Sequence, residues 1–155
     1  MINQAIHTID LLCQFLGTPN TLVATIANHH LKGVIEVEDS CEGLIKFDSG
    51  KQGNFYTTTS FNGGNFTAIT LKTAKHVIEI RQNHLYVNYE KIDLNSTQNK
   101  IIGKACYGSG HFVLIKKFYN AIREGLEAPV TLESASWAVR ILLAAYKSND
   151  EEVNI

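Results

Sequence analysis

Cysteine, excess charge and long apolar runs are all scarce in this 155-residue sequence, and each scarcity excludes a class of protein. The three cysteines, Cys13, Cys41 and Cys106, are an odd number without a Cys-x-x-Cys pair, which favours a reduced, cytoplasmic protein over a disulfide framework. The net charge of −1 leaves no electrostatic footprint for nucleic acid or an anionic membrane surface. Without a run of about 18 apolar residues or a basic start, we expect neither a membrane span nor a signal peptide.

The length of 155 residues predicts a single domain over 1–155. Apolar periodicity predicts a helix over 1–17, strands over 21–91, two helices over 110–148 and a polar, solvated tail after them. Because the strands are joined by short turns such as Asn-Gly-Gly, they are expected to form antiparallel hairpins. The predicted fold is therefore α+β, with a mostly antiparallel, open sheet of about five to seven strands and helices packed on one face.

Four short polar side chains recur along the otherwise apolar first helix at spacings of four, three and four residues: Asn3, His7, Asp10 and Gln14. On a helix they share a sector of roughly 40–60°, which Leu11 and Phe15 flank. A stripe that only faces solvent usually carries Lys, Glu and Arg, and none is present here. An imidazole, a carboxylate and two amides are instead the groups that orient hydroxyls and move protons.

Two interpretations of this stripe are open. In the functional one, His7 is a general acid/base, because an imidazole can give or take a proton near neutral pH, and Asn3 and Asp10 position the ring or the substrate. In the other, His7 and Asp10 form a satisfied polar pair packed beneath the sheet. The spacing of the residues does not choose between them.

Three stretches of the chain resemble the second domain of the Gfo/Idh/MocA oxidoreductases. The first is MINQAIHTIDLLCQFLG, which follows that family's pattern of an acidic residue or Asn, three residues, His, x-x-Asp-Leu and a final Gly. The others are VEDSCEGLIKFDSGKQGNFYTTTSF in the sheet and GHFVLIKKFYNAIREGLEAPVTLESASWAVRILLAAYKS near the end. The likeness covers nearly the whole chain, and the ordered combination is highly specific.

The resemblance implies the substrate-binding and oligomerising portion of an NAD(P)-dependent dehydrogenase that acts on the CH–OH group of a sugar, cyclitol or related polyol. His7 matches the family's catalytic histidine, while Asn3, Asp10 and His111 would support or bind the substrate. A Lys from a Glu-Lys-Pro motif in the cofactor half would assist His7. Asn3 stands where the family often has Asp, and an amide can orient a hydroxyl but cannot accept its proton, which weakens a carboxylate–His relay.

The cofactor half of such an enzyme is missing from this sequence. Neither Gly-x-Gly-x-x-Gly nor Glu-Lys-Pro occurs, so NAD or NADP would be held by an N-terminal Rossmann half, and we expect no cofactor bound to this chain and no activity from it alone. We therefore expect a fragment or the product of a split gene. The alternative is a stand-alone module with the same fold that binds a polyol or assembles subunits without catalysis.

The remaining histidines do not form a metal-ligand pattern, and we predict no metal site. His29 and His30 are adjacent, so on a strand their rings would point to opposite faces. We expect His76 and His84 to face one another across a hairpin, but no cysteine or carboxylate joins them at ligand spacing. For His111, which glycines set off at the start of a helix, the alternative to a substrate role is a capping or surface residue.

The stretch FYTTTSF, residues 55–61, alternates aromatic and threonine side chains. One interpretation is a strand with a solvated face. The other, which the resemblance favours, is a sheet face that pairs with another subunit, since such a face is buried at little desolvation cost. We therefore expect a homo-oligomer formed through the open face of the sheet.

Overall fold

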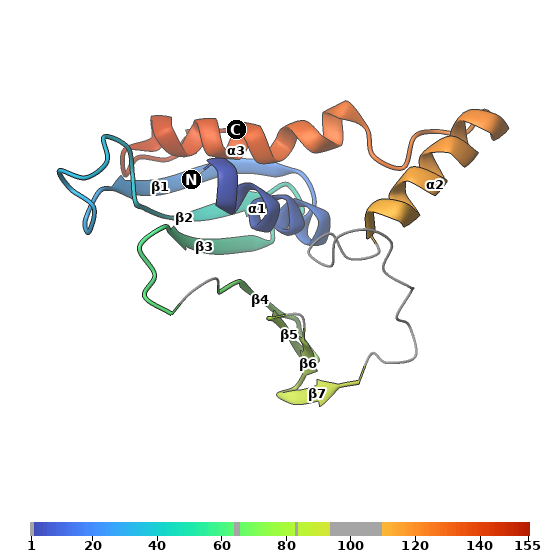
Figure 1. Ribbon diagram of the computed structural model, residues 1–155, viewed down its shortest axis with the longest axis horizontal. Helices are drawn as coiled ribbons and strands as arrows, with labels where there is room; N and C mark the ends of the chain where they lie inside the picture. The colour runs from blue at the N-terminus through green and yellow to red at the C-terminus, as the bar shows by residue number, and fades with distance from the viewer. Residues whose placement is uncertain (1, 64–65, 83, 94–109) are drawn as a thin grey trace. The chain divides into compact units, whose positions relative to one another are not determined.

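The computed structural model describes residues 2–63, 66–82, 84–93 and 110–155, with side chains from Ala5 onwards in the first of these ranges. Its helices are α1 (Ile2–Leu16), α2 (Gly110–Glu124) and α3 (Leu132–Ser148) (Figure 1). Its strands are β1 (Pro19–Ala27), β2 (Ser40–Phe47), β3 (Gln52–Thr58), β4 (Ala68–Lys72), β5 (Val77–Arg81), β6 (His84–Val87), β7 (Glu90–Ile92) and β8 (Val153–Asn154). The α+β class and the antiparallel, open sheet are confirmed.

The chain divides into two compact units. Unit 1 consists of Met1–Asn65 together with Leu132–Ile155, and unit 2 consists of Phe66–Thr131. The described strands divide between the units as two sheets of four, in the orders β3-β2-β1-β8 and β4-β5-β6-β7. Each unit is therefore described by itself below.

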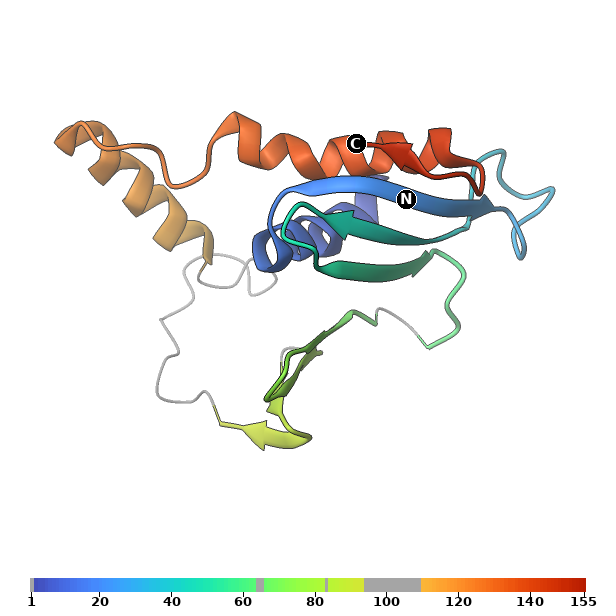
Figure 2. The ribbon, with the colours of Figure 1, turned by 180° about the vertical axis from the view of Figure 1, so that it is seen from behind.

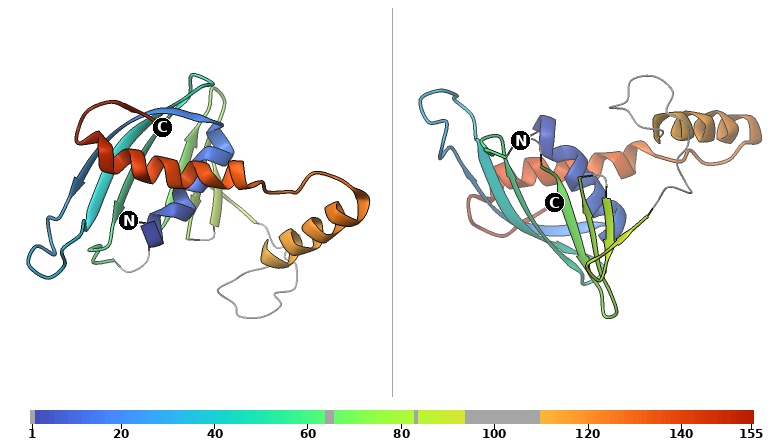
Figure 3. Two further views of the ribbon diagram at one scale, coloured as in Figure 1. Left: turned by 90° about the horizontal axis from the view of Figure 1, so that it is seen from above. Right: turned by 60° about the horizontal axis from the view of Figure 1, so that its bottom comes forward.

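In unit 1, α1 and α3 pack on the same face of the sheet, as the two views of Figure 3 show. Strand alternation turns Leu22, Ile45 and Phe55 toward the helices, where each is at most 8% exposed. The core contains residues of both helices and three strands: Ala5, Ile9, Leu12, Cys13, Leu22, Ala24, Cys41, Ile45, Phe47, Phe55, Ala138, Ile141, Leu142, Ala144 and Ala145. The helix over 1–17 thus buries the apolar side that its periodicity predicted.

The tail after the last helix exposes most of its side chains, as predicted, but it also forms an edge strand that the sequence did not predict. β8 pairs antiparallel with β1, and Figure 2 shows it (red) alongside that strand (blue). The buried Ser148, at the end of α3, links the helix to β1 and to the turn before β8. Its Oγ accepts a hydrogen bond from the Ala24 N–H at 2.8 Å and donates one to the Glu151 carbonyl at 2.5 Å. Contacts far apart in sequence therefore override the polar composition of the tail.

In unit 2, the strand register collects aliphatic side chains on one face of the sheet: Ile69, Leu71, Ile78, Ile80, Leu85, Val87 and Ile92. The opposite face is mainly polar, and there the Arg81 guanidinium lies 4.5 Å from the centre of the Tyr86 ring. Among the described strand residues of this unit, Ile69 alone is buried. The alternation is that of a sheet with one face meant for packing.

Two helices end at glycines, as the sequence predicts. Gly17 follows α1 with φ of +99° and Gly125 follows α2 with φ of +65°, a left-handed conformation that other residues adopt at a cost. No helix in the described ranges is both long and apolar enough to cross a membrane.

Candidate functional site

The polar stripe of α1 lies on the side of the helix that faces away from the core. His7 and Gln14 are exposed and Asp10 is half-buried, whereas Ile9 between them is fully buried. Leu11 and Phe15 flank the stripe and are 40% and 39% exposed. The structure thus brings three of the four predicted stripe residues to one accessible surface, while the side chain of Asn3 lies outside the described part.

This surface contradicts the interpretation of His7 as a residue packed beneath the sheet. Within the described residues, no hydrogen bond joins His7 to Asp10. Burial first, and the nearby charge of Asp10 second, raise the pKa of the Cys13 thiol to about 11. A thiol held in that state is unreactive, so Cys13 is a core residue.

The last turn of α1 packs against β3 and the turn that precedes it, which fixes the direction of the stripe. A Cβ at Gly53 would lie 3.0 Å from Leu16 Cδ1, so only glycine allows this approach without a shift. The Ser49 hydroxyl donates to the Leu16 carbonyl at 3.0 Å, and the Gly17 N–H donates to the Cys13 carbonyl at 2.8 Å. These bonds satisfy helix-end carbonyls.

A second polar cluster, which sequence reasoning missed, surrounds Asp39. This carboxylate is 1% exposed and accepts hydrogen bonds from the backbone N–H groups of His29, His30 and Leu31 at 3.1, 2.5 and 2.8 Å. Burial alone would raise the pKa of Asp39, but these three donors hold it well below its usual range. Asp39 therefore fastens the loop between β1 and β2, and nothing in the local sequence pattern distinguishes it from a surface aspartate.

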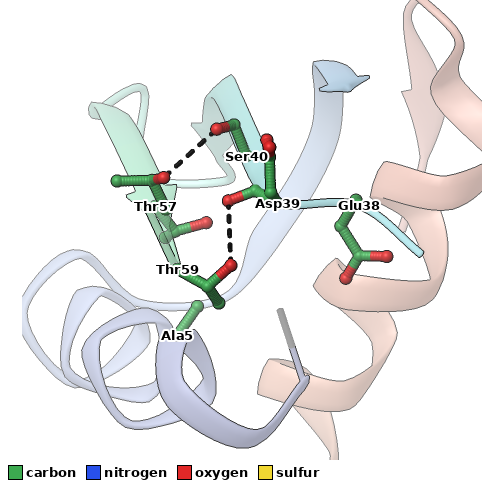
Figure 4. Close-up of a pocket in the computed structure, with 7 residues that line it drawn as sticks. Ala5, Glu38, Asp39, Ser40, Thr57 and Thr59 are labelled. Atoms are coloured by element: carbon green, nitrogen blue, oxygen red, sulfur yellow. Dashed lines mark hydrogen bonds between the residues drawn. The ribbon is translucent and has the colours of Figure 1, made fainter. Parts of the chain in front are cut away.

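A small cavity adjoins Asp39 (Figure 4). Its lining is rich in hydroxyl and carboxyl groups: Ala5, Glu38, Asp39, Ser40, Thr57, Thr58 and Thr59. The Thr59 hydroxyl donates to the Asp39 carbonyl at 3.4 Å. The volume of about 20 Å³ suits a single water molecule and not a sugar ring. Ala5 brings the buried side of α1 to this cavity, so it is not a pocket beside the exposed His7.

The segment before Asp39 is also tied to the last helix. The Tyr146 hydroxyl, on α3, donates to Glu38 Oε1 at 2.7 Å. Burial first, and this bond to a carboxylate second, raise the pKa of Tyr146 to about 12. The phenol is therefore a structural donor at neutral pH, not a proton carrier.

The outer face of the unit 1 sheet is open and forms a shallow groove of about 600 Å³. Its lining mixes apolar and polar side chains: Val23, Ala24, Thr25, Glu42, Gly43, Leu44, Asn54, Phe55 and Tyr56. Of the stretch FYTTTSF, Phe55 is buried toward the helices, while Tyr56 points to the outer face and is 63% exposed. The alternation predicted for this strand is present.

His29 and His30 lie on the surface with ring centres 6.4 Å apart at 73°, an edge contact between rings. No group of three or more His, Cys, Asp or Glu side chains in the described part of the chain is arranged to hold a metal ion. His111 lies in the first turn of α2, in unit 2, and is exposed.

The expectation that His76 and His84 face one another across a hairpin is wrong. His84 is paired with Arg81 at the turn between β5 and β6, whereas His76 precedes β5 at the other end of the hairpin. There its Nδ1 lies 3.2 Å from Asn88 Nδ2. The hairpin register separates the two rings by the length of the strands.

A comparison with protein-family models places α1 and most of the strands in a known domain. The model described as the GFO/IDH/MocA C-terminal domain matches residues 1–81, which is more than half of the chain and includes His7. The chain belongs to the GFO/IDH/MocA C-terminal domain family. No curated protein sequence matches it.

Solved structures share the fold of this GFO/IDH/MocA domain. The WlbA dehydrogenase from Bordetella pertussis, in complex with NADH and UDP-GlcNAcA, is 20% identical with a TM-score of 0.76, over 99% of this chain and 46% of that one. Apo levoglucosan dehydrogenase is 17% identical with a TM-score of 0.81, over 99% and 50%. The aldose-aldose oxidoreductase from Caulobacter crescentus, complexed with glycerol, is 16% identical with a TM-score of 0.73, over 97% and 46%.

The chain spans about half the length of these solved structures. At such identities the likeness shows the fold alone. The topology of this GFO/IDH/MocA domain bears on whether it can hold a dinucleotide. Every pairing between the named strands in the described ranges is antiparallel. In Rossmann folds a dinucleotide is held at a strand–turn–helix unit of a parallel sheet, and no such unit occurs among the described residues.

Proposed function

We propose that this chain is the substrate-binding and oligomerising portion of an NAD(P)-dependent oxidoreductase that acts on the CH–OH group of a sugar, cyclitol or related polyol. The observation that carries the proposal is the exposed His7 on a stripe without Lys, Glu or Arg, within the segment that matches the family model. The names of the solved structures support it, since they are oxidoreductases and dehydrogenases, several in complex with NADH or a sugar.

His7 is the proposed general acid/base. Oxidation of a carbinol removes a proton from oxygen as well as a hydride from carbon, and an imidazole within hydrogen-bond distance of the hydroxyl can accept that proton. In the reverse direction the protonated ring returns it to the carbonyl oxygen. The half-buried Asp10, one turn further along α1, is the proposed positioning residue, and the exposed Gln14 continues the stripe as a hydrogen-bonding group.

Asn3, on α1, and His111, in unit 2, are two further proposed substrate-binding residues. In the proposed role, Asn3 orients a substrate hydroxyl through its amide but does not receive its proton. His111 contributes a hydrogen bond to the substrate from the start of α2. A nicotinamide cofactor held by another part of the enzyme would supply the hydride acceptor or donor, and this chain alone is proposed to be inactive.

The outer face of the unit 1 sheet is the proposed surface of a homo-oligomer. Tyr56, Val23 and Leu44 give it apolar area, and Glu42 and Asn54 give it polar groups, a mixture typical of interfaces. Light scattering should give a dimer or larger assembly. Tyr56→Glu should weaken that assembly by about tenfold or more, because aromatic anchors carry much of an interface's affinity. The control Lys51→Glu makes a larger charge change, of two units instead of one, at the exposed turn beside β3 and should leave the assembly intact.

The catalytic proposal is tested in the enzyme formed when this chain is joined to its dinucleotide-binding half. His7→Ala should lower kcat by about 10²-fold or more, as the loss of a general acid/base does. His29→Ala, which removes another exposed histidine from unit 1, is the matched control and should leave kcat unchanged. Equal activity of the wild-type enzyme and the His7 variant would refute the role.

A binding or assembly module without catalysis is the second candidate, and its fold would be the same, since both candidates lack a dinucleotide-binding unit in the described part of this chain. The two are separated by adding the dinucleotide-binding half, which would leave such a module without turnover of any polyol. Titration of the isolated chain with NADH, followed by nicotinamide fluorescence, should show no binding. Micromolar affinity would contradict the proposal that the cofactor is held by another part of the enzyme.

The single domain over 1–155 and the cytoplasmic location stay predictions. The free, buried Cys13 and Cys41 support the predicted location.

A further inference from the structure

The turn that follows β3 contains an Asn-Gly step, Asn62–Gly63, which occurs once in the sequence (Figure 1). Both residues are exposed. Glycine carries no Cβ, so the backbone nitrogen of Gly63 is the least hindered nucleophile that can follow an asparagine. The step therefore places this nitrogen next to the carboxamide carbon of Asn62, on a part of the chain that water reaches.

The side chain of Asn62 is bonded differently from those of other asparagines. Within the described residues, no hydrogen bond holds its carboxamide. By contrast, Asn20 donates to a carboxylate at 2.8 Å, Asn28 donates to two backbone carbonyls at 3.0 and 2.9 Å, and Asn88 accepts a backbone N–H at 3.0 Å. Each of these three asparagines is followed by a residue with a Cβ. Asn62 thus combines an unheld carboxamide with an unhindered neighbour.

The packing of Phe61 gives a reason for glycine at position 63. A Cβ at Gly63 would lie 2.8 Å from Phe61 Cζ and closer still to Cε1. Any other residue would therefore have to displace the ring, because these separations are well inside van der Waals contact. The turn requires glycine for packing, and the reactive step with Asn62 is a consequence.

We propose that Asn62 is a site of spontaneous deamidation in the folded chain. The Gly63 nitrogen attacks Asn62 Cγ and forms a new C–N bond, while the bond from Cγ to the side-chain nitrogen breaks. The proton of the Gly63 N–H leaves with that nitrogen as ammonia, and a succinimide ring remains. Water then opens the ring. Breaking the bond to Cγ gives aspartate, and breaking the bond to the backbone carbonyl carbon gives isoaspartate. One water is consumed and one ammonia is released, without an oxidant or reductant.

The reaction changes the covalent connection between the two units and spares the strand pairings. Asn62 lies between Thr58, where β3 ends, and Ala68, where β4 begins, and unit 2 starts at Phe66. Either product adds one negative charge to a chain whose net charge is −1, and isoaspartate also lengthens the backbone by one carbon. The proposal does not depend on the oxidoreductase assignment, which His7 carries.

Peptide mapping of the aged full chain tests the proposal. Trypsin cuts after Lys51 and Lys72, so one peptide carries Asn62 together with Asn54, which lies in β3 and is followed by Phe55. After incubation of the folded chain at mildly alkaline pH, fragment masses should show a gain of about 1 Da at Asn62, as an amide becomes a carboxylic acid. This gain should appear about tenfold faster than at Asn54, whose backbone the strand holds. A zero-time sample corrects for reaction during digestion. Equal rates at the two asparagines, or no gain at Asn62, would overturn the proposal.

The urea-unfolded chain shows whether the fold leaves the step reactive. The rate at Asn62 in the folded chain should lie within about tenfold of the rate in urea, because an exposed turn rearranges at little cost in free energy. A stronger suppression by folding would overturn the proposal, since the turn would then protect Asn62.

A glycine substitution tests the attacking atom. Gly63→Ala should slow the gain at Asn62 by about tenfold or more, because the added Cβ obstructs the backbone nitrogen. Gly110→Ala, whose Cβ would meet nothing within 4 Å, is the control and should leave the rate unchanged. Both variants are also measured in urea, where the packing of Phe61 plays no part. An unchanged rate for the Gly63 variant in urea would contradict attack by this nitrogen.

Discussion

The sheets of unit 1 and unit 2 each have one mainly aliphatic face, yet unit 1 buries that face and unit 2 leaves most of its own half-exposed. In unit 1, α1 and α3 supply side chains such as Ile9 and Ile141, both 0% exposed, to the layer beneath the sheet. In unit 2, Ile69 is the buried member of the described strands. Alternation thus sets which face of a sheet is apolar, while helices set whether that face is buried.

The largest effect is expected from opening the core of unit 1. Ile141→Ala should lower the free energy of unfolding by about 2–5 kcal/mol, because it removes a fully buried side chain and leaves a cavity. Val139→Ala, on the exposed side of the same helix, should change it by less than about 1 kcal/mol. Urea unfolding measures both. A loss for Val139 equal to that for Ile141 would break the comparison, since it would mean that α3 is packed on both sides.

The next largest effect concerns the return of the chain to unit 1. Ser148→Ala should cost about 1–3 kcal/mol, because the buried Ala24 N–H loses its acceptor. Ser136→Ala removes a hydroxyl that donates to the Glu133 carbonyl at the other end of α3, and it should cost less. Urea unfolding again gives the values, and hydrogen exchange at Ala24 should locate the change. No loss of protection at Ala24 would contradict the role of Ser148.

A local effect is expected at Asp39. Asp39→Asn should accelerate exchange of the His29, His30 and Leu31 amides by about tenfold, because an amide accepts these bonds less well than a carboxylate. The folded-state pKa of Asp39 is lowered, so its contribution is present above the ordinary pKa of about 3.9 and is lost as pH falls below it. Wild-type exchange, corrected for its intrinsic pH dependence, should therefore rise toward low pH, and that of the variant should not. The same acid sensitivity in both would contradict the assignment.

The smallest effect is expected at Tyr146, which is 45% exposed. Tyr146→Phe should lower the free energy of unfolding by about 0.5 kcal/mol or less, since solvent competes for its bond to Glu38. The pKa of Tyr146 is raised to about 12, so its contribution is present below the ordinary pKa of about 10 and is lost as pH rises through 12. Phenolate absorbance of the wild type and the variant should differ by one group that titrates late.

Elements governed by local periodicity could be predicted from the sequence. The helix expected over 1–17 is α1, the two helices over 110–148 are α2 and α3, and the strands over 21–91 occupy 19–92. The predicted and observed elements agree because the apolar pattern of a helix or hairpin is visible within a short stretch of sequence. The same spacing placed His7 and Ile9 on different sides of α1 but left open whether His7 is exposed or packed beneath the sheet, and its chemical role stays a prediction.

Features held by distant contacts could not be predicted. Beside β8, Glu152 forms an ion pair with Lys46 Nζ at 2.8 Å, and the Ser148 hydroxyl accepts a hydrogen bond from β1, more than a hundred residues earlier in the chain. Asp39 holds a loop by accepting hydrogen bonds from backbone N–H groups. Every residue except proline has such a group, so the sequence does not show which residues will donate. The polar composition of the end of the chain predicts a solvated tail and gives no sign that its backbone pairs with β1.

Unit 2 is inserted into unit 1, since the chain leaves after β3 and re-enters at α3. For unit 1, residues 66–131 are therefore one closed polymer loop, and doubling such a loop costs only about 0.6 kcal/mol. The core of unit 1 can thus accept large changes in the length of the insert. A single proteolytic cut anywhere within it would turn unit 1 into a complex of two polypeptides, held by side-chain packing and by the pairing of β8 with β1.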